Sequence, residues 1–225
     1  ALNYALKFTS GEWLLILDAD AQLKNDTLQK LFQFVYQDSW AVVQLRKSVL
    51  NISKNVLTKC QSIEMVMDSI FQYGRLSLAG VSELRGNGQL IKKAILLECG
   101  AFNENTVTDD LDLSSRLLLT GEKIGIFLNP PVMEEGVETL SALFAQRQRW
   151  VEGGLQRFFD YWRQLIFGDI NFVKRFDIFY FFVLQYALPI ITLLDLFVSM
   201  VLSKKPVYWP ISITAFMLSG IAAWS

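Results

Sequence analysis

The stretch EWLLILDAD occupies residues 12–20. Its apolar run, residues 13–17, shows no polar alternation, which is typical of a strand buried on both faces. Two carboxylates, Asp18 and Asp20, follow the run at once. Strands of this kind belong to sheets covered by helices, where ligands bind beyond the carboxyl ends of the strands. The stretch therefore predicts an α/β layered domain with Asp18 and Asp20 at its ligand-binding edge.

The sequence that follows alternates between helix and strand patterns. We expect helices over residues 25–37, 54–74, 89–97, 108–119 and 139–152, and further strands over residues 40–45 and 123–127. Thr108 is placed to cap one of these helices, and Gly121 is placed to end it. Strands that alternate with helices favour a largely parallel sheet. Residues 1–155 are therefore predicted to form one α/β domain.

The chain becomes more apolar after residue 150. Residues 156–176 interleave aromatic with basic side chains, which predicts an amphipathic segment at a membrane interface. Residues 178–202 carry a single charge, Asp195, and as a helix would reach roughly 37 Å, enough to cross a bilayer with some tilt. Residues 207–225 are expected to begin a second transmembrane helix. Basic residues precede the first span, so we expect the α/β domain on the cytoplasmic face.

The composition excludes several classes of function. A net charge of −1 gives no indication of a nucleic-acid surface. The chain contains no His, so a Ser-His-Asp triad is unsupported, and its two Cys lack the spacing of zinc ligands. The first residue falls inside a helical pattern and the last inside an apolar one, so we expect this chain to be a fragment.

Asp18 and Asp20 are candidate metal ligands. Carboxylate oxygens at this spacing suit Mg²⁺ or Mn²⁺ when substrate phosphates complete the coordination. Such an ion would act as a Lewis acid towards a departing diphosphate. The alternative is a solvated acidic turn, which is common for an isolated Asp-x-Asp.

The segment Thr108-Asp109-Asp110 supplies a candidate general base. Acidic residues in the first turn of a helix are ordinary partners of the helix dipole, so a structural role is a strong alternative. The same dipole would keep a carboxylate ionised, as a base must be. We choose Asp110 as the base, with Asp109 or Asp112 as its neighbour.

Gln146, Arg149 and Trp150 stand at i, i+3 and i+4, so they share one face of a helix. A planar guanidinium can bind a pyrophosphate through two hydrogen bonds, and an indole offers a flat wall to a sugar ring. The alternative is a surface helix whose Trp packs into the core. Gly86-Asn87-Gly88 precedes the helix expected over residues 89–97, where backbone N–H groups could meet phosphate or acceptor hydroxyls. A simple turn is the alternative there.

Together, Asp18-Ala19-Asp20, Thr108-Asp109-Asp110 and Gln146-x-x-Arg149-Trp150, followed by apolar spans, resemble the membrane-bound family 2 glycosyltransferases. These include cellulose, hyaluronan and poly-N-acetylglucosamine synthases and the cyanobacterial monoglucosyldiacylglycerol synthases. The resemblance covers about residues 1–165 and implies a GT-A fold, a UDP-sugar donor, a divalent metal and inversion at the anomeric carbon. The usual Thr-Glu-Asp of the family is Thr-Asp-Asp here, which shortens the middle acid and leaves the base in place.

The resemblance also implies roles for individual residues. Asp18 and Asp20 would hold metal and donor, Asp110 would be the base, and Gln146, Arg149 and Trp150 would bind the donor. Acceptor contacts would come from Trp150, Asp109, Gly86, Asn87 and Gly88. The first strand of the family and its uracil-binding acid would lie upstream of Ala1.

Residues 146–162 look most similar to the glucolipid synthases. We therefore expect transfer of glucose from UDP-glucose to diacylglycerol at the membrane. A processive polysaccharide synthase with a glycan acceptor is one alternative, and a non-catalytic module that binds a sugar nucleotide or a lipid is another.

Overall fold

The computed structural model describes residues 1–207, so nearly all of the second predicted span, residues 207–225, lies outside the described part. The chain divides into two compact units. The first comprises Ala1–Ile170, and the second begins at Asn171.

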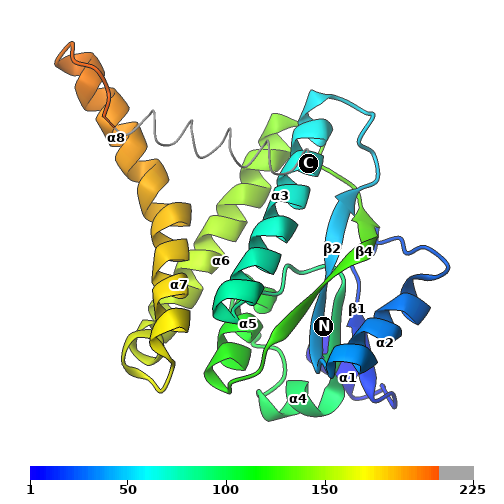
Figure 1. Ribbon diagram of the computed structural model, residues 1–225. Helices are drawn as coiled ribbons and strands as arrows, with labels where there is room; N and C mark the ends of the chain where they lie inside the picture. Colours follow the sequence, from blue (N-terminus) through cyan, green and yellow to red (C-terminus); the bar gives the residue numbers. More distant parts are fainter. Residues whose placement is uncertain (208–225) are drawn as a thin grey trace. The chain divides into compact units, whose positions relative to one another are not determined.

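The first unit is built on a four-stranded sheet with the order β1-β3-β2-β4 (Figure 1). Its strands are β1 (Trp13–Ile16), β2 (Val42–Val49), β3 (Gln89–Lys92) and β4 (Ile124–Glu134). β2 and β4 pair in parallel, whereas β3 is antiparallel to both β1 and β2. β1, β2 and β4 therefore run in one direction, which confirms the predicted α/β domain. The expected largely parallel sheet is a mixed one, because β3 lies reversed between β1 and β2 and only the β2–β4 pair is parallel.

Helices cover both faces of this sheet. They are α1 (Leu2–Leu6), α2 (Thr27–Asp38), α3 (Val56–Ala79), α4 (Lys93–Glu98), α5 (Asp109–Leu119) and α6 (Leu140–Phe167). Figure 1 shows α2 on one side of the sheet and α3 and α5 on the other. Two separate core clusters result. One joins the sheet to α2 and consists of Leu31, Val35, Val43, Leu45, Leu90, Phe127 and Val132. The other joins it to α4 and α5 and consists of Val42, Leu84, Ile91, Leu96, Phe102, Leu113, Leu117 and Ile124.

The helix expected over residues 89–97 is wrong in its first half. Residues Gln89–Lys92 form β3, and only Lys93–Glu98 are helical. This four-residue run lies between β1 and β2, so its backbone groups pair on both edges. Such pairing outweighs the weak helical periodicity of a short apolar segment. Residues 86–88 therefore precede a strand, and no helix N-terminus is available there for phosphate.

α6 is a single helix of 28 residues. The helix expected over residues 139–152 and the interfacial segment expected from residue 156 are consecutive parts of it. The Thr139 side chain caps its start by accepting a hydrogen bond from the Ala142 N–H. The boundary expected at 155/156 therefore lies inside α6, and the division into units comes at 170/171. Several large apolar side chains of its second half are exposed: Phe159, Trp162, Ile166 and Phe167.

The second unit contains a continuous helical stretch, Phe172–Val201, made of α7 (Phe172–Phe182), the π-helical turn η1 (Val183–Ala187) and α8 (Leu188–Val201). Its 30 residues are long and apolar enough to cross a membrane. It begins six residues before the expected span of 178–202. Pro189 is the second residue after the π turn. A proline cannot donate to the carbonyl four residues earlier, here that of Gln185, and the wider turn accommodates this lost hydrogen bond.

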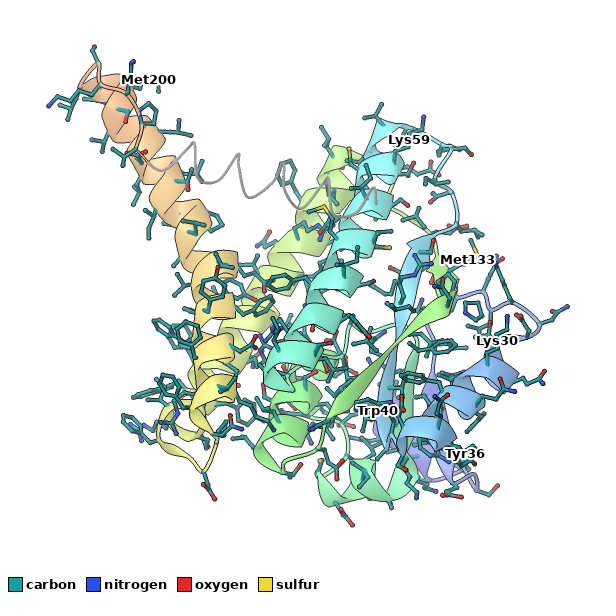
Figure 2. All side chains as sticks on the ribbon, viewed as in Figure 1. Lys30, Tyr36, Trp40, Lys59, Met133 and Met200 are labelled. Atoms are coloured by element: carbon teal, nitrogen blue, oxygen red, sulfur yellow. The ribbon has the colours of Figure 1, made fainter. Side chains whose placement is uncertain are left out.

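Packing of β4 against Trp40 gives a test of this fold. Trp40 lies between α2 and β4 (Figure 2), and a Cβ at Gly125 would come within 2.8 Å of its ring. We expect Gly125→Ala to destabilise the protein by about 1–3 kcal/mol, because the indole must shift. Gly74→Ala is the control, since its new Cβ meets no atom within 4 Å. This substitution should stabilise the protein by about 0.5–1 kcal/mol, because it removes a glycine from a helix interior. Thermal unfolding followed by circular dichroism in detergent measures both; equal effects would contradict the packing described.

Candidate active site

The Asp18-Ala19-Asp20 turn is held at both ends. The Asp18 N–H donates to Asn87 Oδ1 at 3.2 Å, and Asp20 Oδ2 accepts from the Glu135 N–H at 3.0 Å. Just beyond the turn, Gln22 and Met133 exchange two backbone hydrogen bonds of 2.8 and 2.9 Å near the end of β4 (Figure 2). The two aspartates are thus fixed between the 86–88 turn and the carboxyl end of β4, as expected for a ligand-binding edge.

Asn87 joins this edge to β4 and β2. Its side chain is 1% exposed, and its Nδ2 donates to Glu134 Oε2 at 3.0 Å. The other oxygen of Glu134 lies 3.1 Å from the Lys47 ammonium. Gln44 supports the turn from below, since its amide donates to the Asn87 carbonyl at 2.8 Å and accepts from the Arg85 N–H at 2.7 Å.

Asp110 lies against the same turn. A Cβ built on Gly86 would stand 3.6 Å from Asp110 Oδ2, and Gly86 has a φ of +80°. A glycine at this position allows the backbone to approach the carboxylate closely. Gly88 has a different environment, because its Cα faces Val132 and Leu45 in the sheet core. Gly86 and Asn87 therefore border the site, whereas Gly88 packs beneath it.

α5 and α6 meet in a very close contact. A Cβ on Gly153 would overlap the Thr108 side chain, with 2.2 Å to its Oγ1. Thr108 occupies the N-cap position of α5 as predicted, but its side chain makes no capping hydrogen bond. The expected side-chain cap is therefore wrong, because the packing of α6 buries the hydroxyl.

Further contacts come from the part of α6 that follows Gly153. Gln156 accepts from the Val107 N–H at 3.0 Å and donates to the Asn105 carbonyl at 3.1 Å, so α6 holds the loop before α5. The Tyr161 hydroxyl donates to Asp112 Oδ1 at 2.8 Å. Burial and, second, the hydrogen bond to Asp112 raise the pKa of Tyr161 to about 12.

Asp112 has a structural role and is not the neighbour of the candidate base, Asp110. It is 1% exposed and pairs with Arg116 Nη2 at 2.6 Å. Arg116 in turn donates to the backbone carbonyls of Cys99 and Ala101. Asp109 is the residue whose charge acts on Asp110.

The charge of Arg85 also acts on Asp110. The Asp68 carboxylate binds Arg85 through two hydrogen bonds of 3.1 and 3.0 Å, and Glu83 accepts a third at 2.9 Å. Buried Glu83 also pairs with Arg157 of α6 at 2.9 Å and with Arg75 of α3 at 3.5 Å. These arginines keep the pKa of Glu83 well below its usual range despite burial. The network fixes Arg85 close enough for its charge to act on Asp110.

Trp150 lies beside Lys47 of the site, and its neighbour on α6 is Arg147 instead of the predicted partners Gln146 and Arg149. The Lys47 ammonium lies 5.5 Å from the centroid of the indole, and the Arg147 guanidinium lies 4.3 Å from it. Arg147 also forms a bidentate pair with Glu64 of α3. Arg149 is exposed and forms no ion pair within residues 1–207, and half-buried Gln146 forms no hydrogen bond to a site residue there.

The site carboxylates have raised pKa values. Burial is the largest cause for Asp110, followed among the raising causes by the neighbouring charge of Asp109; the Leu111 N–H, Arg85 and Lys47 oppose it. For Asp18, burial and the charges of Glu134, Asp20 and Asp109 raise the pKa, and Lys47 lowers it. The expectation that the helix dipole keeps Asp110 ionised is therefore too simple, because desolvation outweighs the backbone hydrogen bond.

Two residues of this site carried no role in the sequence analysis. Lys47 and Glu134 form a half-buried pair in the centre of the cluster. Two consecutive charged residues after the buried half of a strand, Arg46 and Lys47, were the available signal for Lys47. Residues brought together are thus Asp18, Asp20, Lys47, Gly86, Asn87, Asp109, Asp110, Glu134 and Trp150.

Comparison with known proteins identifies the family. Residues 13–225 match the model of glycosyl transferase family group 2. The chain belongs to this family. The resemblance stated from its motifs is therefore confirmed.

Relatives in the family extend this result. The chain is 40% identical over its whole length to a beta-monoglucosyldiacylglycerol synthase of Synechocystis sp. and 39% identical to one of Trichormus variabilis. It spans 46% and 48% of these relatives, so about half of their length. A probable glucomannan 4-beta-mannosyltransferase of Oryza sativa is 29% identical over 88% of the chain and 35% of the relative.

A solved mannosyltransferase from Pyrobaculum calidifontis, in complex with GDP-Man and Mn²⁺, has a similar fold. Its TM-score is 0.55 at 18% identity, and the match covers 99% of this chain and 64% of that one. This similarity confirms the GT-A fold.

Replacing Asp110 by Asn is expected to stabilise the protein without ligand. The pKa of Asp110 is higher in the folded state than in the unfolded state. At a pH above both of these pKa values, the ionised carboxylate therefore destabilises the fold. The midpoint of thermal unfolding should therefore rise at pH 8, and the gain should shrink towards pH 5. Asp112→Asn, from the same helical turn, should instead lower the midpoint, since it leaves buried Arg116 without its partner. A fall for Asp110→Asn at pH 8 would contradict this electrostatic account.

Proposed function

We propose that the protein containing this chain is an inverting glucosyltransferase that moves glucose from UDP-glucose to diacylglycerol. One observation carries the proposal: the residues of three separated motifs, Asp18, Asp110 and Trp150, surround one site, with Asn87, Lys47 and Glu134 between them. The beta-monoglucosyldiacylglycerol synthases among the relatives supply the donor sugar and the acceptor of the proposal.

Asp110 would act as the general base. It would take the proton of the acceptor hydroxyl while that oxygen bonds to the anomeric carbon and the bond from this carbon to the diphosphate breaks. Attack from the side opposite the leaving group inverts the anomeric configuration. A base is most effective when its pKa approaches the working pH, and burial moves the pKa of Asp110 in that direction. The charges of Arg85 and Lys47 would limit this rise and keep the carboxylate ionised.

Asp18 and Asp20 fit a divalent metal held together with substrate. Within residues 1–207, no group of three or more His, Cys, Asp or Glu side chains is placed to hold an ion by itself. Oxygens from the donor would therefore have to complete the coordination. The crowding of carboxylates that raises the pKa of Asp18 is the charge that a cation would relieve. When bound, Mg²⁺ or Mn²⁺ would neutralise charge on the diphosphate.

The acceptor would arrive from a membrane. α6 carries Trp150 beside the site and exposes Phe159, Trp162 and Phe167 further along. Aromatic side chains of this kind are typical of membrane interfaces. The apolar helix Phe172–Val201 would anchor the protein, with the first unit on the cytoplasmic face.

Asp110→Asn should lower kcat by about 10²–10⁴, because the general base is lost. Donor affinity should change little, since Asn keeps the size of the side chain. Initial rates and calorimetric titration of UDP measure the two effects in the complete protein. Glu122→Gln is the control, because it removes a negative charge at the other end of α5. An unchanged kcat in Asp110→Asn would remove Asp110 from the mechanism.

The donor and acceptor are tested directly with radiolabelled UDP-glucose and diacylglycerol in detergent micelles. We expect one labelled β-linked glucolipid, and its formation should stop when EDTA removes divalent ions and resume with Mg²⁺ or Mn²⁺. Thin-layer chromatography and nuclear magnetic resonance identify the product and its linkage. A water-soluble labelled polymer would identify a polysaccharide synthase instead, and donor binding without any transfer would identify a binding module.

A further inference from the structure

Lys47 is a cation placed among carboxylates. In a regular strand it would face the same side as Leu45, which belongs to the core cluster against α2. The pairing of β2 with β4 shifts register between these two residues, from Leu45–Phe127 to Lys47–Val132. Such irregularities re-aim side chains, often beside active sites. The Lys47 ammonium accordingly lies at Glu134 and over the ring of Trp150.

Lys47 interacts with more groups than the single carboxylate of a simple ion pair. Its side chain is 15% exposed and that of Glu134 is 12% exposed. Glu134 is fixed from behind by buried Asn87, so its position does not depend on Lys47. The charge of Lys47 also acts on Asp18 and on Asp110, which belong to different motifs. Lys47 therefore stands within electrostatic reach of both the candidate donor ligand and the candidate base.

We propose that Lys47 is a further donor-binding residue, which takes the terminal phosphate of the nucleoside diphosphate. This rests on the proposed function, because the terminal phosphate joins the nucleotide held at Asp18 to the sugar that is attacked near Asp110. An ammonium has three donors, and within residues 1–207 a single hydrogen bond, to Glu134, occupies one of them. The remaining donors can meet phosphate oxygens while Glu134 keeps the ammonium in place.

A compact cation at this position would offset the negative charge of a bound diphosphate. The departing diphosphate brings negative charge to a place where Asp18, Asp20 and Glu134 already stand. Lys47 would offset this charge in both the bound donor and the product, so its loss should weaken UDP binding as well as turnover. Trp150 would keep its place above the ammonium through the cation–π contact.

The competing explanation is that Lys47 only neutralises Glu134. The two differ in a double variant. If the pair is purely structural, Lys47→Gln leaves a buried carboxylate unpaired, and Lys47→Gln/Glu134→Gln repairs both the fold and UDP binding. If Lys47 binds phosphate, the double variant recovers the unfolding midpoint but still binds UDP poorly.

The experiment measures the dissociation constants of UDP and UMP for the complete protein in detergent. Lys47→Gln and the double variant should weaken UDP binding about 10- to 100-fold, the range for a charged hydrogen bond. UMP, which lacks the terminal phosphate, should change less than about 3-fold, and Lys47→Arg should retain most UDP affinity. Lys54→Gln is the control, because it removes a lysine whose ion pair with Glu138 lies on the surface.

Unchanged UDP binding in Lys47→Gln, full recovery in the double variant, or equal losses for UDP and UMP would each overturn the assignment. These outcomes are separate from failure of the proposed function. Wild-type protein that neither binds UDP nor transfers glucose would refute the proposed function itself.

Discussion

The active-site edge depends on the side chain of Asn87. Its amide oxygen accepts from the Asp18 N–H at the end of β1, and its amide nitrogen donates to Glu134 at the end of β4. Only a neutral amide can serve both partners, because a carboxylate there would face Glu134 without a proton to donate. The turn that presents Asn87 needs positive φ at both Gly86 and Gly88. Two glycines and one buried amide thus join strands that are not neighbours in the sheet.

A second constraint connects the segment that contains Asp110, the candidate base, to the helix that carries Trp150. Gly153 leaves no space for a side chain against Thr108, so α6 touches the first residue of the Thr108-Asp109-Asp110 segment. Gln156 and Tyr161 extend this contact along α6, one to the loop before α5 and the other to Asp112. Because α6 is unbroken from Leu140 to Phe167, its site residues and its exposed aromatic residues belong to one rigid element. The position of the half with the exposed aromatic residues is therefore linked mechanically to that of the candidate base, Asp110.

Local patterns predicted much of this arrangement. The apolar run before Asp18 indicated a strand buried on both faces. Its side chains pack against both core clusters, but they are only partly buried, because β1 lies at the edge of the sheet. Sequence order could not reveal that β3 inserts in reverse between β1 and β2, because strand pairing is a tertiary property. The helix expected at residue 89 was wrong for the same reason. The capping by Thr108 depended on whether a neighbour would bury its hydroxyl, and Gly153 lies 45 residues further along the chain.

The charges of the site were the least predictable part, since they depend on contacts from several elements. Asp110 was expected to be ionised by its helix, yet burial and Asp109 raise its pKa against the backbone hydrogen bond. Lys47 was overlooked because its direction depends on a register shift in β2 and β4, which no residue pattern marks. A site with four neighbouring carboxylates and few cations is unfavourable when empty. The same imbalance favours binding of a divalent cation, which would offset the charge of the carboxylates and of a diphosphate together. Electrostatic strain in the free protein and the proposed affinity for a metal ion would therefore have one origin, the crowding of Asp18, Asp20, Asp109 and Glu134.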